Sequence, residues 1–72
     1  MKHRAARSAV VRAIGPHGWV VAERPVDYPT RLVVERVADD LRAAVRNDTG
    51  WTPTLIVLDE SGRDVTCHYD VN

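Results

Sequence analysis

The hydrophobic pattern of residues 54–71 changes halfway along the segment. Leu55-Ile56-Val57-Leu58 is apolar at every position, which predicts a strand with both faces shielded from water. Residues 65–71 alternate between apolar and polar positions, which predicts a second strand with one buried face. Glu60-Ser61-Gly62-Arg63 lies between the two segments and is typical of a turn. The pattern therefore predicts a β-hairpin over residues 54–71.

Residues 30–47 have the spacing of an amphipathic helix. Charged residues occupy one side of this helix, Pro29 lies at its start, and Asn47-Asp48-Thr49-Gly50 ends it. We expect the helix to lie across one face of the sheet. The apolar side consists of Val33, Val34, Val37, Ala38, Leu41, Ala44 and Val45.

The pattern of residues 4–14 is compatible with two structures. The alanines and the Gly15-Pro16 stop signal favour a helix. The pair Val10-Val11 favours a strand that folds back on residues 19–24 through the loop 15–18. We prefer the helix because strict alternation is absent from residues 8–14.

These elements predict a small α+β domain. The preferred order is αβαββ, and the alternative, with residues 8–14 as a strand, is ββαββ. Both orders give a mostly antiparallel sheet of three or four strands with the 30–47 helix packed on one face. At 72 residues, the chain 1–72 is expected to form a single small domain.

Composition limits the covalent cross-links, the metal sites and the cellular location expected of the protein. The chain has one cysteine, so it forms no intramolecular disulfide and holds no cysteine-rich zinc site. No apolar run approaches the length of a membrane span or a signal sequence. We therefore expect a cytoplasmic protein that does not associate with membranes.

Cys67-His68 resembles a nucleophile beside its base, but a strand would point the two side chains to opposite faces. Cys67 would then be buried, and His68 would share the outer face with Asp70. That pair alone is an ordinary polar strand face. We expect no catalytic residues, no metal site and no cofactor, and hence a protein that is not an enzyme.

The first twelve residues carry basic side chains and no acidic ones, although the formal net charge of the chain is zero. This basic segment, residues 2–12, is the basis of an alternative function, nucleic-acid binding through phosphate contacts. The candidate residues are Lys2, Arg4, Arg7 and Arg12.

Residues 14–21 are similar to the Ile-Gly-x-x-Gly-x-x-Val pattern of the KH nucleic-acid-binding loop. That loop joins two helices and clamps backbone phosphates in the family. Here Pro16 removes one N–H donor, and the positions between the glycines hold no lysine or arginine. We interpret the segment as a connecting loop.

The apolar strand 55–58 leads to the preferred function. One helix shields one face of a small sheet, so either Leu55 with Val57 or Ile56 with Leu58 faces away from it. We expect a non-enzymatic protein-binding module, accessory or inhibitor-like, that binds another protein or forms a homodimer through a sheet face or edge. The candidate interface residues are Trp19, Val21, Trp51, Leu55 and Val57.

Overall fold

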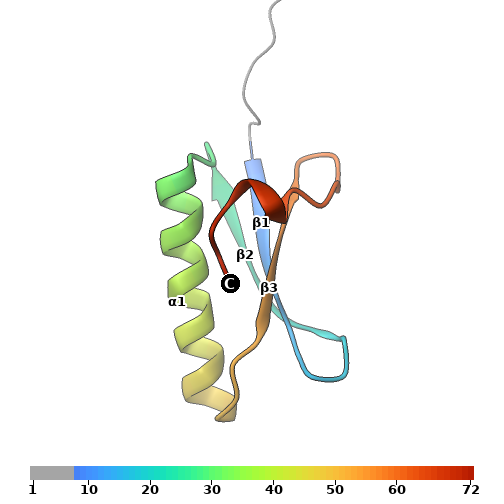
Figure 1. The fold of residues 1–72 in the computed structure, drawn as a ribbon, viewed down its shortest axis with the longest axis vertical. Helices are drawn as coiled ribbons and strands as arrows, with labels where there is room; N and C mark the ends of the chain where they lie inside the picture. The colour runs from blue at the N-terminus through green and yellow to red at the C-terminus, as the bar shows by residue number, and fades with distance from the viewer. Residues whose placement is uncertain (1–7) are drawn as a thin grey trace, which may run out of the picture.

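The computed structural model describes residues 8–72 as a three-stranded antiparallel sheet with one long helix (Figure 1). The strands lie in the order β2-β1-β3, so β1 is central and pairs with both neighbours. The helix packs against the sheet, as expected for an α+β fold. In chain order the elements are β1 (Ser8–Ile14), β2 (Val20–Asp27), α1 (Arg31–Thr49), β3 (Thr54–Asp59) and a short 3₁₀ helix, η1 (Thr66–His68).

Strand β1 corrects the preferred expectation of a helix over residues 4–14, as far as residues 8–14 are concerned; residues 4–7 lie outside the described residues. Burial alternates along β1, with Ala9, Val11 and Ala13 buried and the residues between them half-buried. The outward positions include Val10 and Ile14, so the alternation is one of burial and not of polarity. The order of the described elements is ββαβ.

A tight loop joins β1 to β2 in a hairpin. Gly18 has φ +85°, and its N–H donates to the C=O of Gly15 at 2.9 Å. The Gly15 N–H donates in turn to the C=O of Trp19 at 2.8 Å. The KH-like pattern at residues 14–21 thus connects two strands here, whereas in the KH family it connects two helices.

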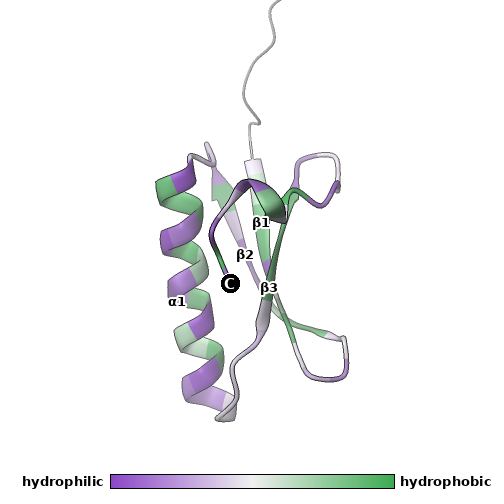
Figure 2. Cartoon of the chain, viewed as in Figure 1, coloured by the Kyte–Doolittle hydropathy of each residue, from purple (hydrophilic) through white to green (hydrophobic). Residues whose placement is uncertain are grey.

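Helix α1 confirms the expectation for residues 30–47 and has a cap at each end. The Thr30 hydroxyl accepts a hydrogen bond from the Val33 N–H at 3.3 Å. Gly50 adopts φ +86°, and its N–H donates to the C=O of Arg46 at 2.8 Å. Hydrophobic and hydrophilic bands alternate along α1 in Figure 2, as an amphipathic helix requires.

The segment after β3 corrects the expected second strand over residues 65–71, and no fourth strand is present in residues 8–72. Asp64 explains the difference, because its Oδ1 accepts hydrogen bonds from the Thr66 N–H at 2.9 Å and the Thr66 hydroxyl at 2.6 Å. These local bonds turn the chain into η1 in place of a strand. An isolated bridge from Leu58 to Asp64 is what remains of the expected hairpin.

One hydrophobic core lies between the sheet, α1 and the C-terminal segment 65–72. Ala22, Val37, Trp51 and Tyr69 pack against this core while partly exposed. The strands supply Ala9, Val11 and Ala13 from β1 and the larger Leu55 and Val57 from β3. The buried apolar residues are Ala9, Val11, Ala13, Val26, Val34, Ala38, Leu41, Val45, Leu55, Val57, Val65 and Val71.

Candidate functional site: the outer face of the sheet

The structure resolves which side chains of β3 face away from the helix. Leu55 and Val57, two of the expected interface residues, are fully buried at 0% exposure against the helix side of the sheet. They therefore do not contribute to an accessible surface. Ile56 and Leu58 take the other face, because neighbouring residues of a strand point to opposite sides.

The face of the sheet opposite α1, here called the outer face, is assembled by the strand register. Val10 lies between Pro25 and Leu58, and Ile14 lies between Val20 and Thr54. Val10, Ile14, Ile56 and Leu58 are half-buried, and Val20 is 48% exposed. Within residues 8–72, α1 and the C-terminal segment both pack on the opposite face. The outer face thus carries a group of apolar side chains and has no covering element from the described part of the chain.

Two charges lie in the middle of this apolar face. Arg12, on the central strand, is opposite Glu23 on β2 and opposite Ile56 on β3. Arg12 Nε lies 2.6 Å from Glu23 Oε2, with 37% and 46% of the two side chains exposed. An ion pair this exposed contributes about 0–1 kcal/mol to stability. The pair nevertheless places a positive charge on β1 and a negative charge on β2.

The hairpin end gathers the other expected interface residues. A Cβ placed on Gly15 would lie 3.2 Å from Val21 Cγ1 and 3.3 Å from Trp51 Cη2, so Val21 and Trp51 flank this glycine. Trp51 is half-buried and packs against the core, where it closes the end of the domain next to α1. Trp19 is 71% exposed, and its ring centroid lies 5.6 Å from that of His17.

The two edges of the sheet differ in how their backbone groups are satisfied. Along β3, Leu55 exchanges hydrogen bonds with the Asn72 side chain, and the Val57 N–H donates to Thr66 Oγ1 at 2.9 Å. The Val57 C=O accepts from the Val65 N–H at 2.8 Å. The Asp59 N–H donates to the Arg63 C=O at 2.9 Å. The C-terminal segment and the preceding turn therefore occupy the edge of β3 that a fourth strand would use.

The other edge, along β2, is open. The Val57 N–H and C=O point away from β1 and form no bond with Val11, which lies opposite. Val11 therefore directs its own N–H and C=O toward Arg24 on β2. The backbone groups of Glu23, Pro25 and Asp27 then point away from the sheet. Among residues 8–72 these groups have no hydrogen-bonding partner.

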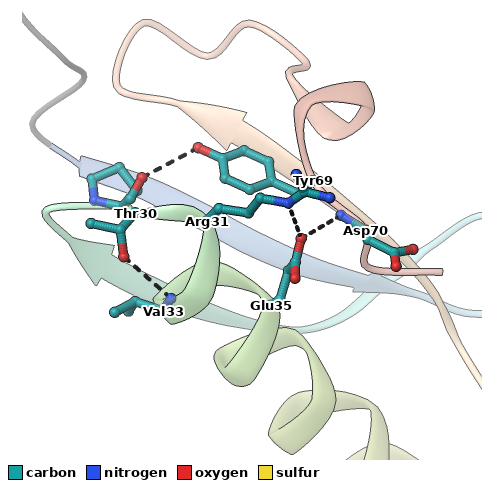
Figure 3. Close-up of polar contacts among 7 residues, drawn as sticks. Thr30, Arg31, Val33, Glu35, Tyr69 and Asp70 are labelled. Carbon is teal, nitrogen blue, oxygen red and sulfur yellow. Dashed lines mark hydrogen bonds and ion pairs between the residues drawn. The ribbon is translucent and has the colours of Figure 1, made fainter.

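Polar contacts tie α1 to the C-terminal segment (Figure 3). Glu35 Oε2 accepts hydrogen bonds from the Asp70 N–H at 2.8 Å and from Arg31 Nε at 2.9 Å. The bond from the Asp70 backbone, followed by that from Arg31, lowers the pKa of Glu35 below its ordinary value. Arg42 adds a hydrogen bond from its guanidinium to the Val71 C=O. The C-terminal segment is thus held between α1 and β3.

The side chains considered for chemistry lie exposed in and after η1. Cys67 lies in η1 and is exposed, contrary to the burial expected from a strand. His68 and Asp70 are also exposed, and no group of three potential metal-ligating side chains converges anywhere in residues 8–72. The carboxylates with lowered pKa in this region serve turns: the Ser61 hydroxyl and then the Arg63 N–H lower the pKa of Asp59, and the Thr66 hydroxyl and N–H lower that of Asp64.

The basic residues proposed for nucleic-acid binding are divided by the structure. Lys2, Arg4 and Arg7 lie outside the described residues. Arg12 lies on the outer face and is paired with Glu23, so its charge is locally compensated.

Sequence reasoning missed Val10 and Ile14 as members of the outer face, because it placed them in a helix. The signal that identifies them is the register of β1 against the all-apolar β3 segment. In the comparisons made, the chain matches no protein-family model, no curated protein and no solved structure. Within residues 8–72, no helix is both long and apolar enough to cross a membrane.

Proposed function

We propose that this chain is a small cytoplasmic, non-enzymatic protein-binding module that binds a second copy of itself through the outer face of its sheet. One observation carries the proposal: a three-stranded sheet has α1 and the C-terminal segment on one face and exposes an apolar surface on the other. Two such faces packed together resemble a β-sandwich, in which each sheet covers the inner face of its partner.

The charges on the outer face favour a second copy over an unrelated protein. A two-fold axis parallel to the strands and midway between β1 and β2 exchanges the positions of these strands. Arg12 of one copy then lies opposite Glu23 of its partner, and Glu23 opposite Arg12. The same axis brings Ile14 over the partner's Val20. The part of the face formed by β1 and β2 is therefore complementary to itself in charge and in apolar surface, and β3 lies beyond the edge of the partner's β2.

The energy of this association comes from the apolar residues. Val10 and Ile14 are already half-buried in one copy and face the partner's Pro25 and Val20, so covering them adds on the order of 1 kcal/mol per side chain. The paired charges contribute little net energy once desolvated, but they define the register of the two sheets.

The alternative function, nucleic-acid binding through residues 2–12, has less support among the described residues. Its described member, Arg12, already has a carboxylate partner at 2.6 Å. A protein whose net charge is zero also lacks the overall field that attracts polyanions.

The molar mass of the chain as a function of concentration tests the proposed dimer. Sedimentation equilibrium is expected to show a monomer at low micromolar concentration and a dimer at high micromolar concentration. Val10→Lys should abolish the dimer, because it puts an unpaired charge opposite the partner's Pro25 in the buried face. Leu32→Lys is the matched control, since Leu32 is 77% exposed on α1 and lies outside the outer face. A wild-type chain that stays monomeric throughout would refute the proposal.

A further inference from the structure

We propose that the open edge of β2 and the adjacent groove under α1 form a second binding site, which takes up an extended segment of another protein as a fourth strand. This site shares the Glu23 and Asp27 side chains with the outer face, but it does not depend on the proposed dimer. Its occupant carries basic residues on one side and apolar residues on the other.

The position of α1 leaves room for such a strand. Helix α1 contacts β2 and β1, while β3 is covered by the C-terminal segment. The helix therefore lies toward the β2 side of the sheet, as Figure 1 shows, and not over its centre. A strand added beside β2 would place α1 over the middle of a four-stranded sheet.

A groove of about 270 Å³ runs between β2 and α1 at this edge. Its lining includes two small side chains, Ala22 on the strand and Ala44 on the helix, and three polar ones, Arg24, Asp48 and Thr49. Ala44 belongs to the apolar side of α1 and is nevertheless exposed. Because alternate side chains of an added strand point toward the helix, apolar ones would enter this groove. The apolar lining residues are Val21, Ala22, Leu41, Ala44 and Val45.

The unpaired backbone groups of β2 would form hydrogen bonds with the main chain of the added strand. The outward-directed groups of β2 are the N–H and C=O of Glu23, the C=O of Pro25, and the N–H and C=O of Asp27. This is the pattern that strand addition uses, with backbone bonds for affinity and alternate side chains for specificity. The side chains of Glu23 and Asp27 project on the outer-face side of the same edge, so residues opposite them are expected to be basic.

Charge and Pro25 argue against a second copy of β2 as the occupant. Antiparallel pairing of β2 with itself centred on residue 23 would place Glu23 opposite Glu23, and pairing centred on residue 24 would place Arg24 opposite Arg24. Pro25 removes one N–H from the edge, which limits long self-pairing. A foreign segment with basic residues avoids like-charge contacts at both Glu23 and Asp27.

The test uses the peptide acetyl-Lys-Val-Lys-Val-Lys-Val-Lys-amide and ¹⁵N–¹H NMR titration of the full chain. We expect shift changes at Glu23, Asp27 and Ala44, with β3 unaffected. Ala44→Arg fills the groove and should weaken binding by about tenfold or more. Ala43→Arg, at the neighbouring exposed alanine outside the groove, should bind as the wild type does. The NMR spectra of both variants also report that they are folded.

Two methylated peptides separate strand addition from simple charge attraction. When the peptide pairs antiparallel to β2 with lysines opposite Glu23 and Asp27, the lysine N–H groups face β2 and the valine N–H groups face away. N-methylation of the lysine amides should abolish binding, and N-methylation of the valine amides should preserve it. Equal binding of both methylated peptides, equal effects of Ala43→Arg and Ala44→Arg, shift changes centred on β3, or no binding at all would each overturn the proposal.

Discussion

The side-chain amide of Asn72 pairs with both backbone groups of Leu55. Asn72 Nδ2 donates to the Leu55 C=O at 2.7 Å, and the Leu55 N–H donates to Asn72 Oδ1 at 2.9 Å. An asparagine amide has the same donor and acceptor as a peptide group, so this pair reproduces the bonding of a neighbouring strand. Asn72 therefore closes the Leu55 end of the β3 edge with a single side chain.

Removing this amide should destabilise the domain. Asn72→Ala leaves the Leu55 N–H and C=O without their partner, which costs about 1–3 kcal/mol when such groups stay shielded from water. Urea unfolding of wild type and variant measures the difference. Thr52→Ala is the control, because Thr52 is exposed and makes no side-chain hydrogen bond within residues 8–72. Equal stability of Asn72→Ala and wild type would show that the pair contributes nothing.

Acid should weaken the attachment of the C-terminal segment through Glu35. Its pKa is lowered in the folded chain by the Asp70 N–H and by Arg31, while in the unfolded chain it lies near the ordinary value of about 4.3. Between these two values the unfolded state binds more protons than the folded state. The stabilisation from Glu35 is therefore complete above about pH 4.3 and is lost as the pH falls through the lowered folded value.

Glu35→Gln tests this linkage, because it removes the titrating group and keeps an acceptor oxygen. The variant should lose less stability than the wild type when the pH falls below about 4, as measured by urea unfolding at several pH values. Asp59 and Asp64 also have lowered pKa values, so part of the acid sensitivity should remain. Asp40→Asn, at an exposed carboxylate of α1, is the matched control. Identical pH profiles for Glu35→Gln and wild type would contradict the role assigned to Glu35.

Truncation of two leucines of α1 should have very different effects on stability. Leu41 is 1% exposed and lies in the core, whereas Leu32 is 77% exposed. Leu41→Ala should lower the free energy of unfolding by about 2–5 kcal/mol, an amount comparable with the whole stability of so small a domain. Leu32→Ala should change it by at most about 0.5 kcal/mol. Similar effects of the two substitutions on thermal unfolding would mean that α1 presents a different side to the sheet.

Cys67 should react readily in the native protein. Its side chain is exposed in η1, so a thiol reagent such as Ellman's reagent should modify it at a rate similar to that in urea. Absorbance of the released thiolate follows the reaction directly. Strong protection of Cys67 in the native state would instead support the strand that the alternating pattern of residues 65–71 predicts.

The helix and the strand β3 follow from the sequence because their signals are local. Amphipathic spacing defines α1, and the apolar run at residues 55–58 defines β3. Strand β1 does not follow, because Val10 and Ile14 put apolar residues on its outward side and interrupt the alternation of apolar and polar positions. Residues 65–71 do alternate between apolar and polar positions. Hydrogen bonds from Thr66 to Asp64 nevertheless turn the chain before it can pair with β3 as a strand.

The candidate site was predictable only as a pair of alternatives. The sequence requires two adjacent residues of β3 to face opposite ways, yet either Leu55 or Ile56 satisfies this requirement. The choice depends on which side of the sheet α1 packs, and that is a property of the assembled fold. Once Ala9, Val11 and Ala13 are seen beneath α1, the register assigns Leu55 and Val57 to the core and Ile56 and Leu58 to the outer face.

A mixing experiment with reversed charges tests the self-complementary outer face most directly. Arg12→Glu makes the two facing charges both acidic, and Glu23→Arg makes them both basic, so each variant alone should be monomeric by sedimentation equilibrium. Mixed in equal amounts, the two variants should form a heterodimer, because each acidic pair then faces a basic pair. This recovery is expected at concentrations where neither variant associates alone. Continued monomers in the mixture, while the wild type dimerises, would contradict the proposed packing of Arg12 against the partner's Glu23.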